Sequence, residues 1–370
     1  MLDKKLLKNF DISVILIVIL LVAIGLVMIS SATHVHETQD YSLVKKQLFF
    51  FVLGLIAIVV ISNIDYRTFA NFCVYMYIAG VLFLVAVLFT EPINGARSWF
   101  KIFGFGLQPS EYFKIVIIIT FSRHIEKIKE KGEEDINSFK NILLLLLHMG
   151  LPILLIMVQP DWGTATVYIG IMIIILFVAN ISYKYIIAAF ASASVILPLL
   201  FFFVMKGYQR DRLLTFWNPE VDPLGAGYQF IQAKIAIGSG QLFGKGLFKG
   251  IQTQLGYLPE QETDLIFPVI GEELGFIWCS IIIIMFVALL LRLVYLATLA
   301  KDYFGSYVIT GVAAMIFFHV LINIGMTIGL APMMGIPLPF LSYGGSSLLA
   351  NMIAVGLALN VAMRRQKINF

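Results

Sequence analysis

Ten stretches of this sequence are apolar over a length that suits a membrane-spanning helix. The hydrocarbon core of a bilayer requires roughly 20 apolar residues per helix. The apolar runs are continuous rather than alternating, which disfavours a transmembrane β-barrel. We predict spans at 12–30, 47–63, 68–90, 110–123, 141–158, 164–181, 184–205, 266–291, 306–330 and 344–362.

The low content of charged residues also indicates a membrane protein. Of the 370 residues, 60% are hydrophobic and 13% are charged, whereas soluble domains contain about 25% charged residues. The chain therefore lacks the charged surface that a soluble protein of this size needs. Cys73 and Cys279 lie in apolar runs and are predicted to be packing residues rather than a disulfide or metal pair. We predict an all-α, polytopic helical membrane protein with a single membrane domain over residues 1–370.

The distribution of basic residues predicts the orientation. Cytoplasmic loops carry an excess of Lys and Arg, and the loops on one side hold 15 of the 26 such residues. The short loops of the other side hold Lys45, Lys46, Arg97 and Lys101. The richer side is expected to be cytoplasmic, and ten spans then place both termini there. The first apolar stretch is expected to be an uncleaved span, because it is longer than a signal peptide requires and nine more follow.

One long connection, at about 206–265, is predicted on the outer side. Loops of this length escape the orientation rule and are usually functional. Two interpretations stay open, namely attraction to anionic lipid headgroups and a site for a phosphate-bearing ligand at the outer membrane surface. The basic residues of this connection are Lys206, Arg210, Arg212, Lys234, Lys245 and Lys249.

Polar residues surround the start of the fourth predicted span. Pro109 suits a first helical turn, with the polar residues before it as caps. Glu111 and Lys114 are spaced i, i+3 and share a helix face, so they could form a structural salt bridge. Intramembrane charge is costly, however, and often marks a functional site. Trp99, in the segment 94–100, is either an interfacial anchor or part of that site.

Two further segments place carboxylates at the ends of predicted spans. Asp161, in the segment 159–164, is either a cap of the sixth span or a site residue. Asp264 precedes the eighth span, where burial or nearby cations would shift its pKa and suit it to general base catalysis; a helix cap is the alternative. On a continuous helix Glu272 would be rotated by about 80° from Asp264, which favours it over Glu273 as a second carboxylate.

A segment rich in Pro and Gly, residues 335–347, precedes the last predicted span. Irregular backbone at membrane depth is tolerated only where it is buried in protein or lines a cavity. We expect either a rigid re-entrant turn or a polar wall of the cavity, with Ser342, Tyr343 and Ser346 as candidate ligand contacts.

Taken together and in order, five segments resemble the SEDS family (shape, elongation, division and sporulation) of bacterial peptidoglycan polymerases. The sequence from Gly329 to Phe340 is similar to the RodA, or elongation, branch. Met333-Met334 and Gln261-Glu262 depart from the residues expected in the family. The resemblance extends over essentially the whole chain and rests on the segments 108–111, 159–164, 222–229, 263–264 and 335–346.

The resemblance implies a glycosyltransferase that polymerises lipid II, an undecaprenyl-pyrophosphate-linked disaccharide pentapeptide, for cell elongation and shape. The enzyme would act at the outer face of the bacterial cytoplasmic membrane. The resemblance implies Asp264 as the essential carboxylate, Glu111 and Glu272 as other important acidic residues, and Trp99 as an important aromatic. It also implies a class B penicillin-binding protein as the partner that supplies transpeptidation.

These expectations combine into a mechanistic hypothesis. Asp264 is the general base for attack of a sugar hydroxyl on C1, with inversion. Lys114 supports Glu111, and outer-face cations bind the pyrophosphate. No metal site or nucleic-acid module is predicted, and a divalent cation stays open as a cofactor. The candidate substrate-binding residues are Arg97, Lys101, Arg210, Arg212, Gln229, Lys234, Lys245, Ser342, Tyr343 and Ser346.

Two other classes of protein compete with this hypothesis. A transporter or flippase of the lipid-linked precursor would use the same basic cavity without forming a bond. Such transporters often contain inverted repeats with paired broken helices, but the sequence has one marked break, before the last span. A purely structural scaffold would not need charges clustered at the outer face.

Overall fold

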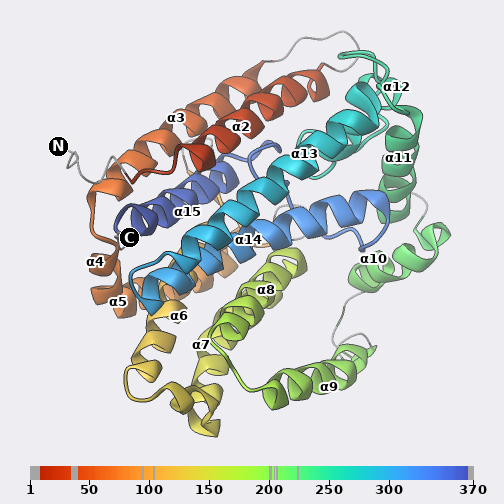
Figure 1. Ribbon diagram of the computed structural model, residues 1–370. Helices are drawn as coiled ribbons and strands as arrows, with labels where there is room; N and C mark the ends of the chain where they lie inside the picture. The colour runs from red at the N-terminus through yellow and green to blue at the C-terminus, as the bar shows by residue number, and fades with distance from the viewer. Residues whose placement is uncertain are drawn as a thin grey trace.

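The computed structural model describes residues 9–34, 41–92, 96–102, 105–199, 202–203, 205, 207–222 and 225–365. These residues form a bundle of long helices (Figure 1). The sheet of the described part has two antiparallel strands, β1 (Phe100–Ile102) and β2 (Phe105–Leu107). Lys206 of the predicted long connection lies outside the described residues, as do Lys4, Lys5, Lys8 and Lys367 among the basic residues counted for the predicted orientation.

Each of the ten predicted spans coincides with a helix. Six of the helices in the described part, α2, α3, α7, α13, α14 and α15, are long and apolar enough to cross a membrane. The predicted fold, a polytopic helical membrane protein, is therefore confirmed. The ten helices are α2 (Ile12–Ala32), α3 (Ser42–Asn63), α5 (Cys73–Ala86), α6 (Pro109–Lys129), α7 (Phe139–Val158), α8 (Trp162–Val178), α9 (Tyr183–Leu199), α13 (Ile266–Thr298), α14 (Tyr303–Ile328) and α15 (Gly345–Met363), and the short elements α4 (Tyr66–Asn71), η1 (Val87–Phe89) and η2 (Glu133–Asn137) lie between them.

The helices α14 and α15 occupy the interior of the bundle. In their most apolar windows 72% of α14 and 83% of α15 is buried, against 17% of α3. Small residues permit the close approach of neighbouring helices in a membrane. A Cβ added to Gly170 of α8 would lie 2.3 Å from the ring of Phe318 in α14, and one added to Gly356 of α15 would lie 3.1 Å from Ile58 in α3. Glycine therefore provides the room for α8 to pack closely on α14 and for α15 to pack closely on α3.

The predicted long connection at 206–265 is itself folded. It contains α10 (Gly207–Trp217), η4 (Pro219–Val221), α11 (Ala226–Ser239) and α12 (Ile251–Gln254). Helix α11 packs against α13 and α14, and Figure 1 shows α10, α11 and α12 gathered at one end of the bundle. This segment is thus a small helical cap over the end of the bundle where α13 begins.

The segment 222–229 supplies the turn that starts α11. The carboxylate of Asp222 accepts hydrogen bonds from the backbone N–H groups of Gly225 (3.0 Å) and Ala226 (2.8 Å). A Cβ at Gly227 would lie 2.0 Å from the carbonyl oxygen of Pro219, so this position has no room for a side chain. The segment 222–229 is one of the five on which the family resemblance rests. Its described residues from Asp222 to Gly227 therefore have a structural role, which is to form the turn before α11.

Helix α13 is broken at Gly275, whose backbone is left-handed (φ 80°). Gly271, four residues before the break, lies against Ile237 of α11. The break was not predicted. A loop after α11 bonds to the backbone groups freed there, with Phe276 N donating to Gln241 O (2.8 Å), Ile277 N to Leu242 O (3.2 Å), Lys245 N to Glu272 O (3.0 Å) and Gly246 N to Glu273 O (2.9 Å).

Ion pairs fix the opposite end of the bundle, where the basic residues predicted to be cytoplasmic lie. Arg67 of α4 pairs with Asp302 at 2.7 Å. Asp302 also caps α14 by accepting from the N–H of Gly305 at 2.7 Å. Arg292, near the far end of α13, pairs with Asp11 ahead of α2 at 2.7 Å. Several of these basic residues thus have structural partners at helix ends.

Candidate active site

Asp264 lies in a tight turn immediately before α13. The turn is closed by two hydrogen bonds to the carbonyl oxygen of Glu260, one from Thr263 N (3.1 Å) and one from Leu265 N (3.3 Å). Helix α13 begins at Ile266, and no side chain caps it. The alternative interpretation of Asp264 as a helix cap is therefore wrong, and its carboxylate is available for another role.

The backbone of Asp264 is held by a side chain of α14. Asn323, which is fully buried, donates from Nδ2 to the carbonyl oxygens of Asp264 (2.9 Å) and Ile336 (2.7 Å). One amide thus joins the turn before α13 to the Pro- and Gly-rich segment before α15. A Cβ on Gly335 would lie 3.2 Å from Oδ2 of Asp264. That segment therefore forms a wall beside the carboxylate, as one of the two sequence interpretations expected.

The carboxylate of Asp264 faces a small cavity of about 50 Å³. The cavity unites three predicted site residues, namely Asp264, Arg212 of α10 and Gln229 of α11. It therefore combines a carboxylate, a guanidinium and an amide at the end of the bundle covered by α10 and α11. The residues that line it are Arg212, Gln229, Pro259, Glu260, Asp264, Leu265, Met326, Met333 and Gly335.

The surroundings of Asp264 make it a stronger base than an ordinary aspartate. The pKa of Asp264 is raised to about 7: burial is the largest cause, the negative charge of Glu260 acts in the same direction, and Arg212 opposes both. A general base works best when its pKa lies near the working pH. Asp264 is therefore suited to accept a proton close to neutrality.

Asp161, in the predicted segment 159–164, contacts the start of α6 and lies near enough to Asp264 for its charge to act on it. Its Oδ1 accepts from the N–H of Thr164 at 3.0 Å and so caps α8, as one sequence interpretation held. Its Oδ2 accepts from Nε2 of Gln108 at 2.9 Å. Pro109 does start α6 as predicted, but Gln108 makes no capping bond to that helix because its side chain binds Asp161 instead. The charge of Asp161 also acts on Asp264.

The predicted pairing of Glu111 with Lys114 is confirmed. Nζ of Lys114 lies 2.7 Å from Oε1 of Glu111 and 2.8 Å from Nε2 of His319 in α14. All three side chains are buried. His319 Nδ1 lies 2.7 Å from the carbonyl oxygen of Met315, so this nitrogen carries the proton and Nε2 can accept from the ammonium. The cluster ties α6 to α14 one turn before Asn323.

The sequence analysis missed His319. A single His in an apolar helix gives no pattern, and its partner Lys114 lies 205 residues earlier in the chain. The signal that could have found it is the rarity of an ionisable residue in such a helix.

Glu272 does not line the cavity of Asp264, which corrects the geometric argument for it as a second carboxylate. That argument required one helix from Asp264 to Glu272, but α13 begins only at Ile266. Glu272 itself is buried and instead forms an ion pair at 2.8 Å with Lys245, which is partly exposed. It also accepts hydrogen bonds from Gln252 N (2.9 Å) and from N (3.0 Å) and Oγ1 (2.9 Å) of Thr253. Lys245, a candidate pyrophosphate ligand, is therefore engaged with Glu272, and any role of either residue in catalysis stays a prediction.

Trp99 lies beside the β-hairpin rather than in the cavity. Its ring packs on Gly106, where an added Cβ would lie 3.1 Å from the indole. Ser346 Oγ donates to the carbonyl oxygen of the same Gly106 at 2.7 Å. The hairpin is thus attached to the start of α15. Asn94 and Gly95, just before Trp99, lie outside the described residues.

The Pro- and Gly-rich segment is also held by its own hydrogen bonds. Oγ of Ser342 accepts from Leu338 N at 2.8 Å, and the carbonyl oxygen of Ser342 accepts from Nε2 of Gln47 at 2.9 Å. Tyr343 N donates to the carbonyl oxygen of Glu262 at 2.8 Å. Ser342 and Tyr343 therefore have structural partners, which fits the interpretation of a rigid turn.

The remaining candidate cations do not line the cavity. Arg97 and Lys101 are exposed near the hairpin. Arg210 donates to the carbonyl oxygen of Phe202 at 2.7 Å. The ammonium of Lys234 lies 4.1 Å from the ring centre of Phe230. Of the described cations in the predicted pool, Arg212 is the one beside Asp264.

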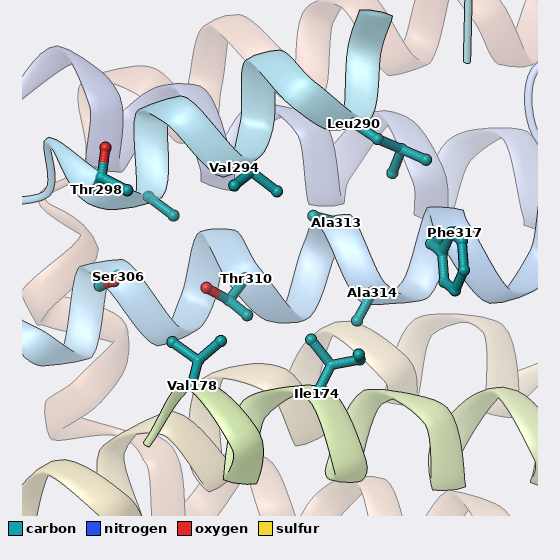
Figure 2. Close-up of a pocket in the computed structure, with 11 residues that line it drawn as sticks. Ile174, Val178, Leu290, Val294, Thr298, Ser306, Thr310, Ala313, Ala314 and Phe317 are labelled. Carbon is teal, nitrogen blue, oxygen red and sulfur yellow. The ribbon is translucent and has the colours of Figure 1, made fainter. Parts of the chain in front are cut away.

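An apolar groove of about 390 Å³ lies elsewhere, between α8, α13 and α14 (Figure 2). Its lining includes Ile174, Leu290, Val294, Thr310 and Phe317. The groove shares no lining residue with the cavity of Asp264 and is therefore a separate feature.

The described residues contain no group of three or more His, Cys, Asp or Glu side chains placed to hold a metal ion. The site described here consists of side chains and backbone groups of the chain itself.

Comparison with known proteins identifies the family. The family model of the FtsW/RodA/SpoVE cell cycle proteins matches residues 11–367. The chain is 35% identical over 364 residues to peptidoglycan glycosyltransferase MrdB of Escherichia coli K12, which covers 98% of this chain and 95% of that relative. It is 38% identical over 360 residues to stage V sporulation protein E of Bacillus subtilis, with 95% and 96% covered.

Solved structures agree with this assignment. A chain of a peptidoglycan synthase complex that coordinates polymerization and crosslinking matches with a TM-score of 0.83 at 28% identity, covering 96% of this chain and 98% of that one. The rod shape determining protein RodA of Thermus thermophilus matches with a TM-score of 0.72 at 26% identity, covering 97% and 98%. The chain is thus a multi-pass bacterial membrane protein, and it belongs to the FtsW/RodA/SpoVE family.

Proposed function

We propose that this family member, a peptidoglycan glycosyltransferase, polymerises lipid II into glycan strands at the outer face of the cytoplasmic membrane. The observation that carries the proposal is the cavity that unites Asp264 with Arg212 and Gln229. A base, a cation and an amide are the groups needed to activate a sugar hydroxyl, attract a pyrophosphate and orient a sugar. The family membership supports the same reaction, since relatives bear the name peptidoglycan glycosyltransferase.

The proposed step is a direct displacement at a sugar carbon. The carboxylate of Asp264 takes the proton from a hydroxyl of the acceptor sugar as the hydroxyl oxygen forms a bond to C1 of the donor. The bond from C1 to the pyrophosphate oxygen breaks, and the undecaprenyl pyrophosphate leaves with the bonding electrons. Arg212 attracts this anion. Displacement with one carboxylate base inverts the configuration at C1, by analogy with inverting glycoside hydrolysis.

The proposed orientation places the cavity outside and both termini in the cytoplasm. The described ends of the chain lie together, because Nδ2 of Asn9 donates to the carbonyl oxygen of Met363 at 3.3 Å. This end of the bundle is opposite α10 and α11 (Figure 1). Arg67 of α4 pairs there with Asp302, and Arg292 pairs there with Asp11 ahead of α2. Basic loops favour the cytoplasmic side, which supports this orientation.

We further propose that the protein serves cell elongation and works with a class B penicillin-binding protein, which crosslinks the strands. A similar chain belongs to a synthase complex that coordinates polymerization with crosslinking. The similarity to RodA of Thermus thermophilus supports the elongation role.

The test is polymerisation of lipid II by the purified protein with its transpeptidase partner. Asp264→Asn keeps the shape of the side chain and removes the base, so the rate should fall on the order of 10²–10⁴-fold. Asp135→Asn, at an exposed position in η2 at the other end of the bundle, is the matched control and should retain the rate. Normal polymerisation by Asp264→Asn would show that the base has been assigned to the wrong residue.

A further inference from the structure

Glu260 lies four residues before Asp264 and begins the turn that presents it. Its backbone is left-handed (φ 49°), a conformation that costs energy in a residue other than Gly and often marks a functional site. Its carbonyl oxygen accepts from Thr263 N (3.1 Å), Leu265 N (3.3 Å) and Thr263 Oγ1 (3.2 Å). These three bonds maintain the unusual conformation, so the turn is well defined.

The turn brings the two carboxyl groups together. Both residues line the same small cavity, of about 50 Å³, so the charge of Glu260 acts on Asp264 at short range. An ionised carboxylate can only accept hydrogen bonds, whereas a protonated one can also donate. A hydrogen bond between the two carboxyl groups therefore forms only when the pair holds one proton. The sequence analysis did not select Glu260, because it considered only carboxylates on the following helix.

The other groups around Asp264 are few. Arg212 of α10 and Asp161 at the start of α8 are the further charges that act on it. Neutral groups complete the cavity: Gln229 of α11 and Met326 of α14. The amide of Asn323 is engaged with backbone carbonyls. Glu260 is thus the carboxylate that shares the cavity with the base.

We propose that Glu260 is a positioning residue for the base: it lines the same cavity as Asp264, and its carboxylate accepts a hydrogen bond from Asp264 once Asp264 has taken the proton of the acceptor. This inference rests on the proposed function, because it assigns a role in the reaction assisted by Asp264. It replaces Glu272 with Glu260 as the second carboxylate of the site.

The chemistry of the pair follows from its charges. The negative charge of Glu260 favours the protonated form of Asp264 and so raises the pKa of Asp264. Above that pKa Asp264 is ionised and can accept a proton. When Asp264 takes the proton of the acceptor hydroxyl, the new O–H can donate to the carboxylate of Glu260. The transferred proton thus creates a hydrogen bond between the two carboxyl groups, and no further reactant is needed.

The experiment is the pH dependence of lipid II polymerisation by the purified protein with its transpeptidase partner. The acid limb of the wild-type rate should have its midpoint near the pKa of Asp264, about 7. Glu260→Gln removes a neighbouring negative charge, so the midpoint should move to lower pH by about one unit. The plateau rate should decrease by less than about tenfold, because the base remains and becomes weaker.

Two other variants make the result interpretable. Glu262→Gln is the matched control, because the carboxylate of Glu262 lies two residues from Glu260 and does not line the cavity. The contact of Glu262 with Tyr343 N is made by its backbone oxygen and is retained in the variant. The midpoint of the acid limb in Glu262→Gln should therefore match the wild type. Glu260→Gly also removes the carboxylate, and Gly adopts the left-handed backbone without strain. This second variant gives the same shift and covers the case in which Glu260→Gln does not fold.

An unchanged acid limb in Glu260→Gln and Glu260→Gly would overturn the role of Glu260. If Asp264→Asn were inactive in the same assay, the proposed function would stand and only the pairing would fail. If Asp264→Asn were fully active, the base itself would be wrongly assigned. A shift in Glu262→Gln as large as that in Glu260→Gln would attribute the effect to the general charge of the loop and would also contradict the proposal.

Discussion

The bonds of Glu272 allow a sharp test of how the loop after α11 is held. This carboxylate is fully buried and receives hydrogen bonds from Lys245, Gln252 and both polar groups of Thr253. We consider the variant Glu272→Gln, which preserves the volume of the side chain. Its carbonyl oxygen can replace Oε1, but its NH₂ group then faces two donors of Thr253.

The expected cost follows from these lost interactions. A hydrogen bond to a charged group contributes about 1.5–3 kcal/mol, and a buried donor without a partner costs about 1–3 kcal/mol. We therefore expect the loop to open more easily by about 3 kcal/mol. Since each 1.4 kcal/mol is a factor of ten, the open population should rise about 100-fold.

Limited digestion with trypsin measures this opening. The loop contains Lys245 and Lys249, and Lys249 is already exposed at the surface. Cleavage follows the open population when the loop opens and closes faster than it is cut. The digestion rate at this loop should rise about 100-fold in Glu272→Gln. Glu220→Gln, which changes an exposed carboxylate of η4 outside this network, should leave the rate unchanged.

The same assay refutes the reasoning if Glu272→Gln is cut at the wild-type rate. Lys245→Gln provides a second comparison, scored by cleavage at Lys249. Lys245 supplies one of the four bonds and its side chain is 26% exposed, so solvent screens the pair and the loss should be about 1 kcal/mol or less. A larger effect for Lys245→Gln than for Glu272→Gln would show that the carboxylate is not the centre of the network.

Two further predictions concern stability. Gly240→Ala places a Cβ 1.9 Å from a backbone oxygen of α13, so we expect a large decrease in the melting temperature. Gly238→Ala is the control, because nothing lies within 4 Å of its added Cβ, and it should be neutral or stabilising by about 0.5–1 kcal/mol. Equal melting temperatures for the two variants would contradict the packing argument. Partial burial raises the pKa of Asp302, but hydrogen bonds from Tyr66 and Gly305 and the pair with Arg67 outweigh this effect and lower the pKa overall. A lowered pKa contributes stability that is present above the unfolded value near 3.9 and is lost as the pH falls through the folded value. The melting temperature should therefore decrease below about pH 5 less steeply in Asp302→Asn than in the wild type, and identical slopes would exclude this contribution.

The features that the sequence predicted correctly depend on neighbours in the chain. A span is recognised because apolar length is a local property, and all ten predicted spans coincide with helices. Glu111 and Lys114 pair because residues spaced i, i+3 share a helix face. Asp264 was found because a carboxylate at the mouth of an apolar helix is unusual, and because its segment resembles a known family.

The errors have the opposite origin. The rotation between Asp264 and Glu272 assumed a regular helix, whereas the chain turns tightly at 260–265 and bends again at Gly275. Both irregularities depend on distant groups, such as the loop after α11 that bonds to the broken part of α13. Lys245 and Ser346 were assigned to substrate because their charge and polarity suggested it, but their partners Glu272 and Gly106 could be identified only in three dimensions.

The buried contact between Lys114 and His319 has a consequence for how the protein is made. Helix α6 leaves the ribosome long before α14, because the two contact residues are separated by 205 positions. During that interval the lysine has only Glu111, on its own helix, as a partner within the cluster. The contact with His319 can form only once α14 has been made, so the central helix of the finished bundle completes the polar cluster of a helix synthesised much earlier.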